Sequence, residues 1–381
     1  MATFPFKIKA TEGAARTGTL STTRGDIRTP AFMPVGTAGT VKALYMDQVK
    51  SAGADIILGN TYHLMLRPGA ERVKRLGGLH AFSGWKGPML TDSGGFQVWS
   101  LAQLRKMDAD GVTFQSHIDG STHRLTPARS IEIQADLLGA DISMQLDECT
   151  NFPCTHKEAE RSLKLSLDWG QRSLDAFGDR DSQTLFGIIQ GSNFADLREQ
   201  SAKGVIAQGF GGIALGGLAV GEGHEQMCAT IDMTVPHLPD ALPRYVMGVG
   251  KPIDLVESVA RGIDMFDCVL PTRSGRHGQA WTWAGPVNVK NAQFAEDLSP
   301  IDEAVDCPAS RDYSRAYYHH LFKAGEYLGP MLLSWHNTAF FQALMAEIRL
   351  SIQEGRFEAL RSELAVRWAG TKSSPKADTQ A

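Results

Sequence analysis

The stretch LFGIIQGSNFADLREQSAKGVIAQGFGGIALGG, residues 185–217, contains two apolar runs separated by a helical pattern. The first run, residues 185–189, ends abruptly at Gln190, and the second, residues 213–215, ends at a glycine pair. The segment between them, residues 196–209, has the composition and length of a helix. Short apolar runs that alternate with helices are typical of parallel strands joined by helical crossovers. We therefore predict a β/α/β unit here.

The same alternation continues along most of the chain. Further apolar runs end in a polar residue or a glycine at 56–58, 89–91, 142–146, 245–247 and 265–266, and helical patterns cover 158–177 and 253–262. Seven such runs favour an α/β fold of the closed (β/α)8 type, the TIM barrel, over an open sheet. In that barrel the carboxyl ends of the strands build the active site. The polar residues at these ends should converge on one pocket; they are Asn60, Asp92, Asp147, Gln190 and Asp267.

Two segments depart from this alternation. Residues 97–124 show a strand-like pattern, so we expect an inserted hairpin near the barrel mouth. Residues 286–337 are expected to form an insertion subdomain, followed by two final helices over 339–354 and 357–370. We therefore predict one catalytic barrel domain over residues 1–370, which includes this subdomain. The polar residues 371–381 are expected to form a disordered tail.

The composition narrows the class of protein. The 381 residues are 43% hydrophobic, enough for a substantial core, and no run approaches the ~20 apolar residues of a membrane span. The N-terminus lacks the apolar core of a signal peptide. Five cysteines without a paired framework fit a reducing, cytoplasmic location. The net charge of −4 gives no global sign of nucleic-acid binding, so an RNA-binding surface has to be local.

The predicted pocket combines carboxylates, an amide and glycines. Paired carboxylates serve reactions at a sugar anomeric carbon, where one acts as the nucleophile and the other as acid and base. Phe96 and Met247 are candidates to hold the two faces of a planar base, although both equally suit an apolar core. Each polar strand end taken alone equally suits a helix cap. Four of them at one barrel mouth favour the chemical interpretation.

The segment MFDCVLPTRSGRHG, residues 265–278, adds two arginines to the strand-end carboxylate of Asp267. Arg273 and Arg276 lie three residues apart on a loop that also contains glycine, serine and histidine. Such arginines can grip RNA phosphates and base edges. Ion pairs with surface carboxylates are the structural alternative.

Seven motifs together resemble the bacterial tRNA-guanine transglycosylases, or queuine tRNA-ribosyltransferases. In chain order, between about residues 5 and 365, they are GNTYHLMLRPG, LTDSGGFQVWSL, QLDECT, FGIIQGS, GGLAVGE, YVMGVGKP and FDCVLPTRSGRHGQA. The resemblance implies a TIM-barrel pentosyltransferase of queuosine biosynthesis. Its activity would be to exchange guanine at the anticodon wobble position (G34) of GUN-anticodon tRNAs for preQ1, 7-aminomethyl-7-deazaguanine.

The resemblance also implies the role of each site residue. Asp267 would be the nucleophile that attacks C1′ of the wobble ribose, Asp92 the general acid and base, and Asn60 the residue that orients the nucleophile. Two displacements at one carbon give net retention through a covalent ribosyl-enzyme. Base binding is implied for Ser93, Phe96, Asp147, Cys149, Gln190, Gly217, the carbonyl of Leu218, Val220 and Met247. Cys149 and Val220 match the arrangement for preQ1, with the bulkier queuine as the alternative.

On the RNA side, the resemblance assigns Lys251, Arg273 and Arg276 to the anticodon loop. It further implies a cytoplasmic homodimer that acts on tRNA without a catalytic cofactor and without a membrane.

The chain departs from the family at a structural zinc site. The family motif Cys-x-Cys-x-x-Cys with a distant histidine is a strong zinc signature, but Val305 and Ser310 stand where two of its cysteines are expected. Cys307 and His336 remain, and two ligands do not make a closed four-coordinate site. We therefore expect a subdomain without zinc. Asp306 completing a weaker site is the alternative.

Two other functions compete with the transglycosylase. A non-catalytic paralogue that binds RNA or a partner subunit would explain the altered zinc motif. However, such a protein has no chemical reason to keep Asp92, Asp147, Gln190 and Asp267 together. A carbohydrate hydrolase on the same barrel would use the carboxylates but leaves the GGLAV loop and the two arginines unexplained.

Overall fold

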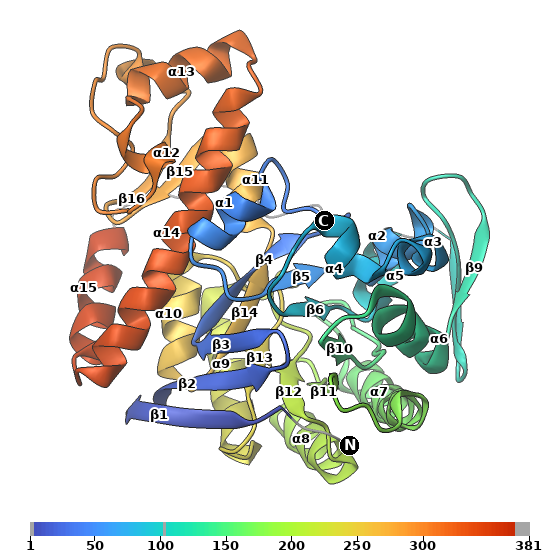
Figure 1. Ribbon diagram of the computed structural model, residues 1–381. Coiled ribbons are helices and arrows are strands. Elements are labelled where there is room, and N and C mark those ends of the chain that lie inside the picture. The colour runs from blue at the N-terminus through green and yellow to red at the C-terminus, as the bar shows by residue number, and fades with distance from the viewer. Residues whose placement is uncertain (1–3, 102–103, 370–381) are drawn as a thin grey trace.

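The computed structural model describes residues 4–101 and 104–369. Eight parallel strands close into a barrel in the order β4–β5–β6–β10–β11–β12–β13–β14, with β14 pairing back to β4. This confirms the (β/α)8 prediction (Figure 1). The tail predicted over residues 371–381 lies outside the described residues. The barrel strands are β4 (Ala31–Gly36), β5 (Ile57–Gly59), β6 (Met89–Thr91), β10 (Ile142–Met144), β11 (Thr184–Ile189), β12 (Gly212–Leu215), β13 (Arg244–Val246) and β14 (Met265–Cys268).

The first barrel strand and the sheet before it were not predicted. The strand β4 contains Pro34, and a proline within an apolar run weakens the sequence signal for a strand. Before it, an antiparallel sheet lies beneath the barrel in Figure 1 and consists of β1 (Phe6–Glu12), β2 (Ala15–Thr22) and β3 (Gly25–Thr29). Leu20 and Ile27 of this sheet join the apolar cluster that fills the barrel interior. The sheet therefore closes the end of the barrel opposite the active site.

Helices cover the outside of the barrel. The predicted helices at 158–177, 196–209 and 253–262 are found as α7 (His156–Phe177), α8 (Ala195–Gln208) and α10 (Pro252–Ala260). No helix of the described residues is both long and apolar enough to cross a membrane. The other elements around the barrel are α1 (Met46–Ser51), α2 (Thr61–Leu66), α3 (Ala70–Arg75), α4 (Gly78–Ser83), α6 (Pro127–Ile131), the π-helical turn η1 (Glu132–Leu138), α9 (Gly223–Thr234), η2 (Val235–His237) and α11 (Leu270–Arg276).

The segment expected to form an inserted hairpin is a short helix followed by a three-stranded antiparallel sheet. The helix is α5 (Gly95–Leu101), and the strands are β7 (Arg105–Asp108), β8 (Gly111–Gln115) and β9 (Thr122–Leu125). Val112 and Phe114 of β8 pack in one apolar cluster with Leu146, just beyond the carboxyl end of β10. The inserted sheet is thus anchored beside the barrel mouth.

The C-terminal part combines a projecting subdomain with long helices, as Figure 1 shows in orange and red. The helix α14 (Leu328–Gln353) begins eleven residues before the helix we predicted from residue 339. Pro330 lies in its first turn, where a proline is tolerated because the first N–H groups need no intrahelical partner. The remaining elements are β15 (Gln279–Thr282), β16 (Gly285–Asn288), η3 (Ala292–Phe294), α12 (Pro308–Arg311), α13 (Arg315–Ala324) and α15 (Phe357–Ala369).

Side-chain alternation along the strands determines which residues enter the barrel. Met265 lies in the interior cluster, whereas Phe266 packs in the cluster under the outer helices. Because successive side chains of a strand point to opposite faces, Asp267 continues the inward face of Met265. The same parity holds for Leu58 and Asn60, Leu90 and Asp92, and Ile188 and Gln190, where the first residue of each pair lies in the interior cluster.

Candidate active site

Asp267 is held at the carboxyl end of β14 by two hydrogen bonds to one of its oxygens. The hydroxyl of Tyr245 donates to Oδ1 over 2.6 Å, and the N–H of Gly248 donates to the same atom over 2.8 Å. Tyr245 is fully buried on the neighbouring strand β13, where Met265 pairs with it across the ladder. Its position is therefore fixed by the barrel core. The hydrogen bonds leave Oδ2 of Asp267 without a partner among residues 4–101 and 104–369.

Asn60 contacts Asp92 rather than the nucleophile that we expected it to orient. Its Nδ2 donates to Oδ2 of Asp92 over 2.6 Å, while its Oδ1 caps α2 by accepting from the N–H of His63. The N–H of Thr61 donates to the other Asp92 oxygen over 2.8 Å. The start of α2 therefore holds Asp92. The orienting bonds of Asp267 come instead from Tyr245 and Gly248.

Asp147 forms the third acidic group of the site, together with two of the predicted base-binding residues. Nε2 of Gln190, at the end of β11, donates to Asp147 Oδ2 over 2.7 Å. The hydroxyl of Ser93 lies 3.4 Å from Oδ1, and it also accepts the N–H of Gly95. Asp147 and Gln190 thus present an acceptor and a donor side by side, the pattern that reads the polar edge of a heterocycle.

Glycines after β12 allow the chain to pass close to the Gln190 amide. A Cβ at Gly216 would lie only 2.5 Å from Gln190 Nε2, and one at Gly217, whose φ is +68°, would lie 3.0 Å from Gln190 Oε1. A side chain at either position would displace the Gln190 amide, and Gly217 also has a backbone conformation that favours glycine. The N–H of Gly217 approaches the Cys149 thiol, and burial raises the pKa of that thiol to about 12. Cys149 is consequently a neutral, apolar wall at neutral pH rather than a nucleophile.

Burial raises the pKa of all three carboxyl groups of the site. Burial, together with the charges of Asp267 and Asp147, raises the pKa of Asp92 to about 7, against the hydrogen bond from the N–H of Thr61. Burial likewise raises the pKa of Asp147 to about 6 and raises that of Asp267, although each accepts hydrogen bonds that oppose the shift. A carboxyl group that titrates near pH 7 is suited to general acid and base catalysis.

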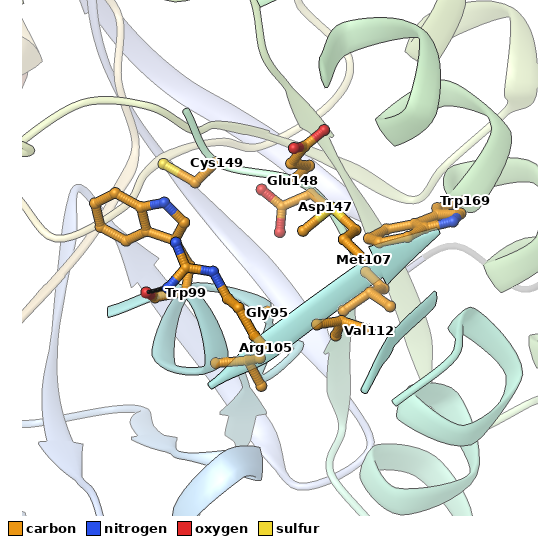
Figure 2. Close-up of a pocket in the computed structure, with 11 residues that line it drawn as sticks. Gly95, Trp99, Arg105, Met107, Val112, Asp147, Glu148, Cys149 and Trp169 are labelled. Atoms are coloured by element: carbon orange, nitrogen blue, oxygen red, sulfur yellow. Dashed lines mark hydrogen bonds between the residues drawn. The ribbon is translucent and has the colours of Figure 1, made fainter. Parts of the chain in front are cut away.

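The inserted segment supplies a further wall beside Asp147. Figure 2 shows Trp99 of α5 and Arg105 of β7 across from Asp147 and Cys149, with a cavity of about 10 Å³ between these elements. That volume is close to the space that one water needs. Nη1 of Arg105 donates to the carbonyl of Trp99, which ties the sheet to the helix. The inserted segment therefore borders the site directly.

Three further predicted base-binding residues lie, like Gly217, on the loops after β12 and β13. Leu218 is buried, whereas Val220 and Met247 are partly exposed. The carboxylate of Glu222 accepts the N–H groups of Ala219 and Val220 and so fixes the backbone of this loop. Phe96 lies on α5, where its ring packs against Trp99 with the centroids 5.3 Å apart. The role of Phe96 and Met247 as a base sandwich stays a prediction.

The helix α11, directly after Asp267, presents Arg273 and Arg276. Nδ2 of Asn337 on α14 donates to the Pro271 carbonyl over 2.9 Å, and a Cβ at Gly275 would lie 2.7 Å from the backbone of α14. The glycine in the RSGR motif therefore permits close packing of the two helices. Burial and the neighbouring Arg273 lower the pKa of Arg276. The third predicted RNA contact, Lys251, is an exposed residue just before α10.

The residues at the expected zinc position form a hydrogen-bonded, apolar cluster. Val305, Cys307, Ser310 and His336 are all buried. Ser310 Oγ lies 2.8 Å from His336 Nδ1, and His336 Nε2 lies 2.8 Å from the Trp281 carbonyl. Since a carbonyl only accepts, Nε2 carries the ring proton and Nδ1 accepts from Ser310. Among the described residues, no group of three or more His, Cys, Asp and Glu side chains is arranged to hold a metal ion.

The sequence prediction missed two residues that hold the site together. Tyr245 was treated only as part of an apolar strand, although its place two residues before Met247 puts both side chains on the inward face. Arg198 lies within a helix that we predicted correctly, but nothing in its spacing indicates a buried guanidinium. Only the three-dimensional packing brings it to the back of the pocket.

Known proteins are similar to this chain over nearly its whole length. The family model described as queuine tRNA-ribosyltransferase matches residues 11–370. A queuine tRNA-ribosyltransferase of Caulobacter vibrioides is 66% identical over 370 residues, which are 97% of this chain and 100% of that protein. A protein with the same name from Brucella melitensis is 62% identical over 366 residues, which are 96% of this chain and 97% of that protein. Another from Zymomonas mobilis is 59% identical over 374 residues, which are 97% of this chain and 97% of that protein. The chain therefore belongs to the queuine tRNA-ribosyltransferase family.

Proposed function

We propose that this protein is a tRNA-guanine transglycosylase that exchanges guanine at the wobble position of GUN-anticodon tRNAs for preQ1. Family membership over residues 11–370 supports the ribosyl transfer. The observation that carries the chemistry is the placement of Asp267, Asp92 and the Asp147–Gln190 pair at one barrel mouth. This set supplies a nucleophile, an acid and base, and a surface that reads a heterocycle.

In the first displacement, Oδ2 of Asp267 attacks C1′ of the wobble ribose and forms a C–O bond. The C1′–N9 bond to guanine breaks, and its electron pair stays on the base. Tyr245 and Gly248 bond only Oδ1, so they orient the carboxylate while Oδ2 stays available. In the second displacement, N9 of the incoming base attacks C1′ and releases the Asp267 carboxylate. Two inversions at the same carbon give retention.

Asp92 handles the proton in both half-reactions. Protonated Asp92 gives its proton to the departing guanine, and the resulting carboxylate takes a proton from the incoming base. A pKa of about 7 allows both forms to be populated at neutral pH. Asn60 and Thr61 stabilise the ionised form by donating to both oxygens.

Base recognition falls to Asp147, Gln190, Ser93 and the glycine loop. The hydrogen-bond pattern of guanine and preQ1 is the same along the edge that these side chains read, so one pocket serves both substrates. Cys149 is a buried, neutral thiol beside Gly217, and together with Val220 it matches the arrangement that the resemblance implies for the small preQ1. We therefore propose preQ1, rather than the bulkier queuine, as the incoming base.

We further infer that the RNA lies along α11 and the loop before α10, where Arg273, Arg276 and Lys251 present positive charge. A homodimer in the cytoplasm, acting without a catalytic cofactor, is the setting that we propose for this reaction. The protein has five free cysteines, consistent with a reducing compartment.

We also propose that the subdomain folds without zinc. The lone pair of His336 Nδ1, which a metal would need, already accepts the Ser310 hydroxyl, and Val305 offers no ligand atom. The Tyr318 hydroxyl donates to the Ala309 carbonyl and closes the loop from the other side. These hydrogen bonds and the buried Val305 replace the cross-link that a metal would supply.

The exchange reaction tests the proposed function directly. Wild-type protein incubated with an unmodified GUN-anticodon tRNA and labelled guanine should incorporate label into the RNA. The Asp267→Asn variant should incorporate none while it still binds the RNA, because the nucleophile is gone. Asp26→Asn, at the opposite end of the barrel, is the matched control and should exchange normally. Incorporation that survives Asp267→Asn would refute the assignment of the nucleophile.

The pH dependence of kcat/KM for tRNA should report Asp92. The first displacement needs Asp92 protonated and Asp267 ionised, so the rate should decline as pH rises through about 7. In Asn60→Ala, loss of a donor to the ionised carboxylate raises the pKa of Asp92, and the alkaline limb should move to higher pH. An alkaline limb that stays in place, or moves to lower pH, would exclude Asp92 as the group observed.

Metal analysis of purified protein tests the zinc-free subdomain. Wild type should contain no stoichiometric zinc, and its melting temperature should not change with a chelator. The double variant Val305→Cys/Ser310→Cys restores two thiolates beside Cys307 and His336, so it should bind one zinc per chain and melt at a higher temperature with zinc present. One tightly bound zinc in the wild-type protein would contradict the proposal.

A further inference from the structure

Arg198 is a fully buried arginine at the back of the base pocket. It lies in the first turn of α8, and its side chain has no exposed area. Nε donates to the Ser192 carbonyl over 2.6 Å, and Nη1 donates to the Ile189 carbonyl over 3.2 Å. Both carbonyls belong to the segment that leaves the carboxyl end of β11, on either side of Gln190. The guanidinium therefore spans the loop that carries Gln190.

The charge of this guanidinium has no direct counter-ion. Among the described residues, its side-chain hydrogen bonds go only to backbone carbonyls, and its Nη2 makes none. Burial lowers the pKa of Arg198 to about 10, so the group is still charged at neutral pH. A buried charge without a partner is costly, and an apolar residue of similar size often serves stability as well or better. Stability alone therefore does not account for an arginine here.

The loop held by Arg198 is conformationally strained. Ser192 has a φ of +51°, in the left-handed region that residues other than glycine rarely adopt, and it follows Gly191 at +124°. Such residues persist only where the surrounding structure enforces them, and they cluster at functional sites. The 2.6 Å hydrogen bond from Arg198 to the Ser192 carbonyl supplies this constraint. It fixes the backbone two residues beyond the Gln190 side chain.

Arg198 also borders the second pocket loop, after β12. A Cβ at Gly217 would lie 3.4 Å from Arg198 Nη2 and 3.0 Å from Gln190 Oε1. The guanidinium and the Gln190 amide thus both pack against the side of Gly217 where a Cβ would stand. Glu222, which braces this side of the pocket, is the carboxylate whose charge acts on Arg198. One side chain therefore sets the spacing between two loops that face the base.

We propose that Arg198 is a positioning residue for the purine base. It holds Ser192 in its left-handed conformation and backs Gly217, and through these contacts it fixes the Gln190 amide at the distance that the base edge requires. It acts through other residues and does not itself touch the substrate. The proposal rests on the proposed guanine exchange, in which Gln190 and Gly217 read the base. Its consequence is that binding of the free base depends on a residue outside the pocket lining.

Steady-state exchange with labelled guanine tests the proposal. Arg198→Met removes the charge and both hydrogen bonds, and it should raise KM for guanine by about tenfold or more, because small misplacements of positioning groups are costly. The affinity for tRNA should not change. Arg198→Lys, which keeps the charge and one donor, should recover part of the loss. Arg349→Met is the matched control: this partly buried arginine also donates to a backbone carbonyl, that of Pro30, just before β4 at the opposite end of the barrel.

A second substitution separates positioning from simple stability. If Arg198 acts by holding Ser192, then Ser192→Gly in the Arg198→Met background should restore KM for guanine, because glycine adopts a positive φ without strain. Equal rises of KM in the Arg198 and Arg349 variants, or an unchanged KM in a folded Arg198→Met protein, would overturn the proposal. If Arg198→Met does not fold, the same comparison is made with Arg198→Lys with and without Ser192→Gly. Wild type that exchanges no guanine would overturn the proposed function instead, so the two failures are distinguishable.

Discussion

The hydrogen bonds from Tyr245 and Gly248 to one oxygen of Asp267 are the constraint on which the site depends. A carboxylate enclosed by a barrel has lost most of its water, and its charge must be held by fixed dipoles instead. A phenol and a backbone N–H that bond only Oδ1 stabilise the charge without occupying the second oxygen. The barrel provides this geometry because Tyr245 pairs with Met265, two residues before Asp267, on the adjacent strand.

The other groups of the site are arranged around this partly exposed carboxylate. Its charge helps to raise the pKa of Asp92 to about 7, which allows Asp92 to carry a proton at neutral pH. On the opposite wall, Asp147 is bonded to Gln190, and the backbone that carries Gln190 is clamped from behind by Arg198. The residues that carry out the ribosyl transfer and those that recognise the base thus lie on separate strands, and their side chains come together only at the barrel mouth. Close packing of the strands keeps the two parts in register.

The sequence predicted the inward-facing strand ends because their signal is local. An apolar run followed closely by Asn60, Asp92 or Asp267 predicts both a strand and the polar residue at its carboxyl end from only a few neighbouring residues. The partners of these residues were not predictable in the same way. Tyr245 resembles a core aromatic, and Arg198 resembles any helical arginine, until the strands are brought side by side. Asn60 contacts Asp92 instead of Asp267 because the end of β6 lies next to the end of β5 in the barrel. The spacing of these residues along the chain does not show which strand ends are neighbours.

The identity of the nucleophilic atom is tested most directly by locating the covalent bond. Wild-type protein would be mixed with a GUN-anticodon RNA, quenched in acid, digested with nuclease and trypsin, and analysed by mass spectrometry. The ribosyl group should be found on the tryptic peptide of residues 262–273, and fragmentation should place it on Asp267 rather than on Asp264. A ribosyl group on Asp92, or exchange that proceeds without any ribosyl-enzyme, would contradict the mechanism.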